Sequence, residues 1–186
     1  GLTSVRKWAL ASSVCFGIAG IPASVLRNDA TALVIGAGPI ALLWLVALRA
    51  SGIARTIVAG RRPARLAVAR AFGADLTLGE HDDVAAAVRR ETEGRGADLV
   101  VECTGLPEVW SAAPAHARRG GHVVLFGGCR PGTTVALVGA KRGRMAANMV
   151  WSLQADEALI VEMDMHDGFW LFGMGGPFVQ SMDFLY

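Results

Sequence analysis

The segment between positions 31 and 51 constrains the fold more than any other part of the chain. A short apolar run leads into a glycine-containing hexapeptide, and an apolar helical pattern follows it. The hexapeptide consists of Gly36, Ala37, Gly38, Pro39, Ile40 and Ala41. It matches the pattern G-x-G-x-x-G/A, which carries a chain from a strand into a helix through a tight turn. In that pattern Gly36 permits the turn and Ala41 lets the helix pack closely on a sheet.

The same hexapeptide predicts a site for a phosphate group. Gly38 keeps a β-carbon out of the path of a pyrophosphate. The helix that begins at Pro39 offers free N–H groups and the positive end of its dipole to an anion. Gly36, Gly38, Pro39, Ile40 and Ala41 are therefore predicted binding residues. The alternative is an ordinary glycine turn with no ligand.

From Thr31 onward, short apolar runs alternate with helical patterns, which predicts an α/β fold with a doubly wound parallel sheet, the Rossmann fold. The expected strands are Ala32–Ile35, Thr56–Ala59, Asp75–Leu78, Asp98–Cys103, His122–Phe126 and Thr133–Val138. The expected helices are Pro39–Ser51 closed by Gly52, one from Pro63 to Gly73 with Leu66, Ala69 and Phe72 on one face, one capped by Asp82 or Asp83, and Pro107–Ala117.

The ends of the chain differ from this central part. Residues 1–30 show no clear period, and we expect a helical N-terminal extension there. Residues 31–140 form the expected dinucleotide-binding domain. Residues 141–186 are a divergent tail without an assigned fold, and they contain all six methionines of the chain.

The end of the second expected strand indicates which dinucleotide binds. An NAD-selective domain usually places an acidic residue there, against the ribose 2′-hydroxyl. This chain has Gly60, Arg61 and Arg62 instead. Two guanidinium groups can pair with a 2′-phosphate, which predicts NADP in preference to NAD. The alternative is that both arginines are solvated charges before a helix.

Composition and charge exclude other classes. The net charge is +2 and the arginines are scattered among carboxylates, so there is no footprint for nucleic acid. Three distant cysteines without a C-x-x-C pair favour a reducing compartment, the cytoplasm. The histidines lack metal-ligand spacing and are expected in loops or at the surface. They are His81, His116, His122 and His166.

Two charge-free stretches, Trp8–Leu26 and Ala30–Leu48, are long enough to cross a bilayer, so a membrane hairpin or a cleaved signal peptide is the main structural alternative. Gly36, Gly38 and Pro39 lie near the centre of the second stretch. These residues break a helix but suit a strand, a turn and a helix. The sequence therefore favours a chain with no membrane span.

The order of several segments resembles the medium-chain dehydrogenase/reductase superfamily, in particular zinc-type alcohol and polyol dehydrogenases. The resemblance runs from about Thr31 to Val135 through ALVIGAGPIALL, GRRPARLAVARAFGAD, TEGRGADLVVECTG and RRGGHVVLFGG. The G-x-R-P pattern at Gly60 is similar to that of NADP-dependent members. The resemblance also implies that two turns lie along the path from adenosine to nicotinamide, unless they are only strand-ending turns. They contain Thr104 and Gly105, and Gly127 and Gly128.

The resemblance implies hydride transfer between a nicotinamide and an alcohol or carbonyl substrate, with zinc polarising the substrate oxygen. Family members hold that zinc in a separate domain, whose Gly-His-Glu motif this chain does not contain. We therefore expect no catalytic residue and no metal ligand here, and little turnover by this chain alone. A non-catalytic dinucleotide-binding module is the alternative. The resemblance also implies a possible homo-oligomer through the sheet edge. The tail after Ala140 departs from the family pattern, and we expect it to be a truncated, fused or frame-shifted end.

Overall fold

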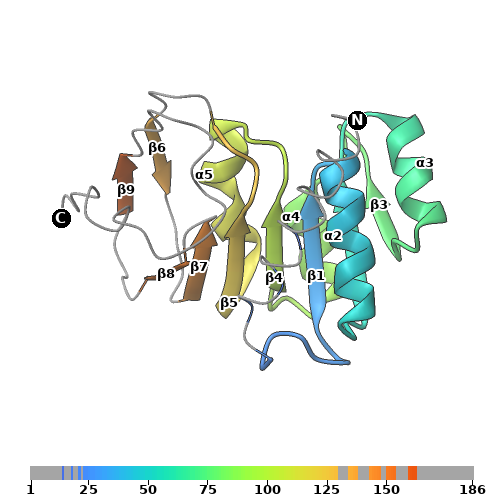
Figure 1. The fold of residues 1–186 in the computed structure, drawn as a ribbon, viewed down its shortest axis with the longest axis horizontal. Helices are drawn as coiled ribbons and strands as arrows, with labels where there is room; N and C mark the ends of the chain where they lie inside the picture. The colour runs from blue at the N-terminus through green and yellow to red at the C-terminus, as the bar shows by residue number, and fades with distance from the viewer. Residues whose placement is uncertain are drawn as a thin grey trace, which may run out of the picture.

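A computed structural model describes residues 23–129, the single positions Val14, Ile18 and Ile21, and the backbone of four later strands. The elements of the first range are β1 (Thr31–Ile35), α2 (Pro39–Ala50), β2 (Arg55–Ala59), α3 (Pro63–Ala71), β3 (Leu76–Leu78), α4 (Val84–Glu91), β4 (Ala97–Glu102), α5 (Pro107–His116) and β5 (Ala117–Leu125). The later strands are β6 (Thr134–Leu137), β7 (Gly143–Ala147), β8 (Val150–Leu153) and β9 (Leu159–Glu162). Figure 1 shows how these elements are arranged.

The main sheet has the strand order β3-β2-β1-β4-β5-β7-β8. Every pair from β3 to β7 is parallel, and β8 joins the edge in the antiparallel direction. The first strand of the chain lies inside the sheet, so the order reverses between β1 and β4. This is the arrangement of a doubly wound sheet, and it confirms the predicted Rossmann fold.

Helices cover both faces of the sheet, because successive strand residues point to opposite sides. In β1, Ala32 and Val34 pack with α2 and α3, whereas Leu33 packs with α4 and α5. Figure 1 shows α2 in front of β1 and α4 behind the sheet. Trp44 of α2 is fully buried and meets Phe126 edge to face, with 5.3 Å between the ring centroids. Both faces of the central strands are therefore buried, as their apolar sequences indicated.

Positions 30–48 do not form one helix. They contain β1, the glycine turn and most of α2, as the sequence favoured over a membrane hairpin. In the described part of the chain, no helix combines the length and apolar character that a membrane span needs. Most of the other charge-free stretch, Trp8–Leu26, lies outside the described residues.

The expected start of the fifth strand at His122 was wrong, because β5 begins at Ala117, directly after α5. The pairing with β4 steps from Ala97–Ala117 to Leu99–His122, so a bulge accommodates the extra residues of β5. Gly120, with a φ of +68°, lies inside this irregular part of the strand and does not end a loop. The strand also buries His122, which is 2% exposed and so contradicts the expected surface position.

The sixth expected strand exists, but it does not belong to the main sheet. Strand β6 pairs antiparallel with β9 in a separate two-stranded sheet. The place beside β5 is taken by β7, which follows position 140. The main sheet therefore continues into residues 141–186, the segment that was expected to be a tail without an assigned fold.

Two details of the helices differ from or refine the expectation. Phe72 is 51% exposed, because α3 ends at Ala71 and the chain turns away before this side chain reaches the buried face. Asp83 is the N-cap of α4, and its carboxylate accepts a hydrogen bond of 2.9 Å from the N–H of Ala86. Asp82 instead accepts one of 2.6 Å from the N–H of Gly79.

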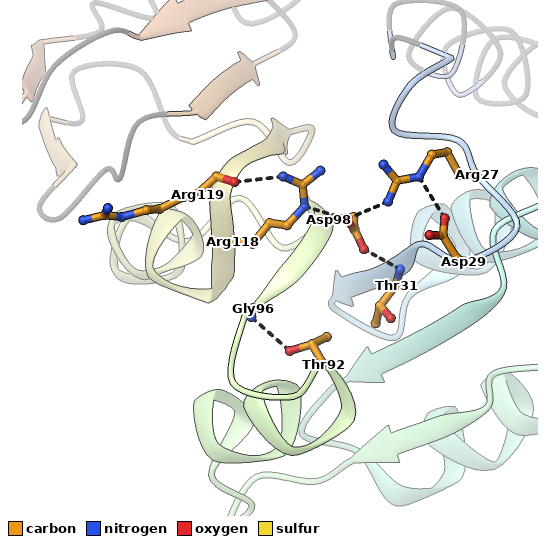
Figure 2. A network of polar contacts seen from close by, with 8 residues as sticks. All are labelled: Arg27, Asp29, Thr31, Thr92, Gly96, Asp98, Arg118 and Arg119. Atoms are coloured by element: carbon orange, nitrogen blue, oxygen red, sulfur yellow. Dashed lines mark hydrogen bonds and ion pairs between the residues drawn. The ribbon is translucent and has the colours of Figure 1, made fainter.

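A polar network fixes the strands at the edge of the sheet where they begin, as Figure 2 shows. Asp98 of β4 is 1% exposed and accepts hydrogen bonds from the N–H of Thr31 (2.9 Å) and the Nε of Arg118 (2.5 Å). A guanidinium nitrogen of Arg27 lies 3.6 Å away. Residues from β1, β4 and β5 are thereby held together at the edge opposite to the glycine turn.

Candidate functional site

The strand register brings the predicted site residues to one edge of the sheet. Ile35, the last residue of β1, pairs with both Ala59 of β2 and Glu102 of β4. Glu102 pairs in turn with Leu125 of β5. The residues that follow these four strand ends therefore emerge at one level, beyond the carboxyl ends of the strands, where ligands bind in open α/β sheets.

The two glycines of the β1–α2 turn differ in what their surroundings require. Gly36 has a φ of +115°, and an added β-carbon would meet the Cγ2 of Thr104 at 3.3 Å. Its backbone conformation therefore explains this glycine. Gly38 has a φ of −88°, which any residue adopts, and an added β-carbon would meet no atom within 4 Å. Packing within the described residues therefore gives no reason for a glycine at position 38.

Helix α2 begins at this turn, and no side-chain cap or acidic residue of its first turn compensates the positive end of its dipole. Gly38 is its N-cap and supplies no side-chain hydrogen bond, Pro39 has no N–H to donate, and the first turn contains no acidic residue. The first helical hydrogen bond runs from the N–H of Leu42 to the carbonyl of Gly38, at 3.1 Å. The N–H groups of Ile40 and Ala41 have no acceptor within the helix, since they lie in its first turn. The turn thus offers donors and a positive dipole end to an anion.

Gly60 follows β2 and touches the glycine turn. Its N–H donates to the carbonyl of Leu78 at 2.9 Å, and an added β-carbon would lie only 2.8 Å from the Cβ of Ala37. Gly60 is therefore fixed by its contact with the turn. A substitution that adds a side chain here disturbs the turn as well as any selection between NAD and NADP.

Arg61 and Arg62 are exposed beside the glycine turn, and neither forms an ion pair or a side-chain hydrogen bond among residues 23–129. The carbonyl of Arg62 accepts hydrogen bonds from the N–H groups of Arg65 and Leu66, which starts α3. Arg65 is a third exposed cation in the first turn of that helix. Arg65 is not among the residues predicted from the sequence, although it lies only three residues after Arg62, the N-cap of α3. Three exposed guanidinium groups thus lie close together in sequence at the end of β2, and no side-chain partner of theirs is found among residues 23–129.

The two predicted turns beyond β4 and β5 meet each other. A β-carbon on Gly105 would collide with the carbonyl oxygen of Gly128, and one on Gly127 would collide with the backbone nitrogen of Gly105. The close approach of two backbones therefore explains both glycines. The hydroxyl of Thr104 is engaged inside its own turn, because it donates to Glu102 and accepts a hydrogen bond of 3.2 Å from the N–H of Leu106.

Glu102 is a second residue at this edge that was not predicted from the sequence. It is the last residue of β4 and is 0% exposed. Its carboxylate accepts hydrogen bonds from the N–H of Thr104 (2.5 Å), the Thr104 hydroxyl and the N–H of Gly105 (3.2 Å). Burial raises the pKa of this carboxyl, and the hydrogen bonds from Thr104 oppose the shift. The available signal was a carboxylate at the end of an otherwise apolar strand.

The thiols at this edge are not activated. Burial, and then the charge of Glu102, raises the pKa of Cys103 well above its usual value, and burial raises the pKa of Cys129 to about 11. Both thiols therefore keep their protons near neutral pH, so neither has the character of a nucleophile. Among the residues that the structure describes, no group of three or more His, Cys, Asp or Glu side chains is placed to hold a metal ion.

The strand order, the glycine turn at the reversal point and the helix that begins there define this molecule as an α/β protein of the Rossmann type. The family follows from the sequence. The chain belongs to the zinc-binding dehydrogenase family, whose model matches residues 39–156. The match confirms the resemblance to zinc-type dehydrogenases, and it continues past Ala140, beyond which the tail was expected to depart from the family pattern.

Relatives with assigned activities are polyol and amino-acid dehydrogenases. Sorbitol dehydrogenase of Homo sapiens is 35% identical over 111 residues, which is 58% of this chain and 31% of that protein. Sorbitol dehydrogenase of Bacillus subtilis is 30% identical over 125 residues, 67% of this chain and 35% of that protein. L-threonine 3-dehydrogenase of Bacillus subtilis is 37% identical over 92 residues, 49% of this chain and 26% of that protein. The chain thus covers between 26% and 35% of the length of these three relatives.

Solved structures agree with the fold. An alcohol dehydrogenase of Thermotoga maritima superposes with a TM-score of 0.65 at 28% identity, covering 78% of this chain and 41% of that one. A protein of Sinorhizobium meliloti 1021 solved with NADP superposes with a TM-score of 0.67 at 23% identity, covering 77% of this chain and 43% of that one. The second likeness shows the fold alone.

Proposed function

We propose that this chain binds NADP(H) at the carboxyl edge of its sheet, as the cofactor-binding part of a zinc-type alcohol or polyol dehydrogenase. The observation that carries the proposal is the β1–α2 turn. It combines an open space at Gly38 with a helix start that has no anion of its own. A pyrophosphate would occupy that space and accept hydrogen bonds from the N–H groups of Ile40 and Ala41.

Selection of NADP over NAD would come from the end of β2. Arg61 and Arg62 are exposed, and no carboxylate of residues 23–129 pairs with either of them. A ribose 2′-phosphate placed beside Gly60 would pair with these guanidinium groups through charge-assisted hydrogen bonds. Arg65 stands close enough in sequence to add a third. An NAD-selective domain usually has an acidic residue at this position, whereas this chain has glycine.

The remaining residues would orient the cofactor. The Thr104–Gly105 and Gly127–Gly128 turns lie beyond β4 and β5, on the other side of the reversal point from β2, and would receive the second half of the dinucleotide. A bound nicotinamide supplies hydride chemistry toward an alcohol or carbonyl carbon. Among the described residues, no set of side chains is placed to hold the zinc of the family. We therefore expect cofactor binding with little turnover. A cytoplasmic location remains a prediction.

The proposal is tested by calorimetric titration of the 186-residue chain with NADPH and with NADH. A charge-assisted hydrogen bond is worth about 1.5–3 kcal/mol, and the exposure of both arginines reduces this to about 1 kcal/mol each. Replacing both Arg61 and Arg62 with alanine should therefore weaken NADPH binding by about 30-fold and leave NADH binding nearly unchanged.

The matched control replaces Arg89 and Arg90, two exposed arginines of α4 on the other face of the sheet, and should leave the ratio of the two affinities unchanged. Equal affinity of the original chain for NADPH and NADH would contradict the NADP preference. Absence of binding by either would contradict the proposed function itself.

A further inference from the structure

We propose that Glu102 is a positioning residue, which sets the turns beyond β4 and β5 in the shape that receives the second half of the dinucleotide. This inference rests on the proposed function. Its starting point is that one carboxylate is hydrogen-bonded to the first turn and lies close to the second. It accepts hydrogen bonds from the Thr104 hydroxyl and from two successive N–H groups, those of Thr104 and Gly105. On the other side, a β-carbon on Gly127 would lie 2.8 Å from its Oε2.

The sheet itself does not require a carboxylate at this place. The neighbours of Glu102 in the register are Ile35 and Leu125, so the adjoining strands end in apolar residues at the same level. Glu102 is fully buried, and burying a carboxylate disfavours its charged form, as the raised pKa of this group reflects. An apolar residue would fill the position at lower cost. The hydrogen bonds to the turn are what the carboxylate provides in return.

These hydrogen bonds connect the turn to the rest of the site. Thr104 is exposed at the sheet edge, and its Cγ2 is the nearest atom to the position of a β-carbon on Gly36, in the phosphate-binding turn. The partner turn is held from α5, where the indole nitrogen of Trp110 donates to the carbonyl of Gly127 at 2.8 Å. Glu102 thus lies between a turn fixed by Trp110 and a turn that reaches toward Gly36.

The strand order assigns the two halves of the cofactor to different places. The half that carries the 2′-phosphate would lie beside β2, and the half that carries nicotinamide beside β4 and β5. A defect at Glu102 should therefore affect the complete dinucleotide and spare a ligand that ends at the first half. Adenosine 2′,5′-bisphosphate is such a ligand, because it lacks the second ribose and the nicotinamide.

The experiment compares the calorimetric affinities of the original chain, Glu102→Gln and Thr104→Val for NADPH and for adenosine 2′,5′-bisphosphate. Glu102→Gln keeps the side-chain shape but turns one acceptor into an N–H donor that faces other donors. We expect NADPH binding to weaken about tenfold, with bisphosphate binding unchanged to within about twofold. Thr104→Val, which replaces the hydroxyl with a methyl group, should act in the same direction by about threefold. The matched control is Glu108→Gln, at an exposed position in the first turn of α5.

The thermal midpoint separates positioning from a merely structural role. Glu102→Gln removes a buried charge, which offsets the cost of the lost hydrogen bonds, so the midpoint should change little while NADPH affinity falls. Parallel loss of stability and of both ligands would overturn the inference, and so would NADPH affinity equal to that of Glu108→Gln. If Glu102→Gln did not fold, an NADPH affinity of Thr104→Val equal to that of the original chain would overturn it. In each of these cases the proposed function stands, because the original chain binds both ligands. If the original chain bound neither, both proposals would fail.

Discussion

Replacing Gly38 with alanine should separate cofactor binding from folding. The φ and ψ angles of Gly38, −88° and 178°, are accessible to alanine, and the added methyl group would meet no atom within 4 Å. Loss of glycine at a helix N-cap costs about 0.5–1 kcal/mol. Alanine also lowers the conformational entropy of the unfolded chain, which stabilises the folded state by about 0.4–1 kcal/mol. The free energy of unfolding should therefore change by less than about 0.5 kcal/mol.

Gly36→Ala is the contrasting variant in the same turn. Gly36 has a φ of +115°, and an added β-carbon would press against the Cγ2 of Thr104 at 3.3 Å. Strain of this kind costs about 1–3 kcal/mol. In a chain of this size, each kcal/mol lowers the thermal midpoint by about 2–4 °C. Gly36→Ala should therefore unfold several degrees below the original chain, whereas Gly38→Ala should unfold with it.

NADPH affinity, unlike stability, should be lost in Gly38→Ala. The methyl group of Gly38→Ala would occupy the space that a pyrophosphate needs, and we expect NADPH affinity to fall at least about tenfold, or about 1.4 kcal/mol. Thermal unfolding and calorimetric titration of both variants measure the two effects independently. If Gly38→Ala bound NADPH as tightly as the original chain, the assignment of this space to the cofactor would be refuted.

Three further predictions follow from the structure. Asp98→Asn should lower the free energy of unfolding by about 1–3 kcal/mol in urea, because it weakens a buried network, and should leave NADPH affinity unchanged at the opposite edge of the sheet; a loss of affinity would contradict this. Since burial raises the pKa of Glu102 above 4.5, its neutral form stabilises the fold at low pH and this contribution is lost as the pH rises through the folded-state pKa. Urea titrations should then show Glu102→Gln gaining stability relative to the original chain as the pH rises, and a pH-independent difference would count against it. Gly60→Ala should lower the free energy of unfolding by about 1–3 kcal/mol and weaken the binding of NADPH and NADH equally, because its methyl group presses on Ala37 in the glycine turn. A loss of NADPH binding alone would contradict this prediction.

The parts of the fold that sequence reasoning predicted are those specified locally. The glycine hexapeptide fixes the β1–α2 turn by its backbone requirements, and Gly36 indeed adopts the left-handed φ that the pattern requires. The central strands are buried on both faces, so their apolar runs were visible without knowledge of their partners. Asp83 could be proposed as a cap because its hydrogen bond is made within one helical turn.

The parts that could not be predicted depend on distant partners. Arg118 and Gly120 do not look like strand residues, yet β5 includes both, because buried Asp98 of β4 holds Arg118 and a bulge absorbs the irregular pairing. Strand β6 was visible as a strand, but its pairing with β9 was not. Glu102 was overlooked because its role depends on a turn two residues later and on a second turn that arrives with β5.

The most direct test of the central claim, that the β1–α2 turn binds the pyrophosphate, is an NMR titration of the ¹⁵N-labelled chain with NADPH. The amide signals of Gly36, Gly38 and Ile40 should move as the ligand saturates. The amides of Thr31 and Gly96, at the opposite edge of the sheet, should stay in place. Saturable binding that moved the second set and left the first unchanged would contradict the account.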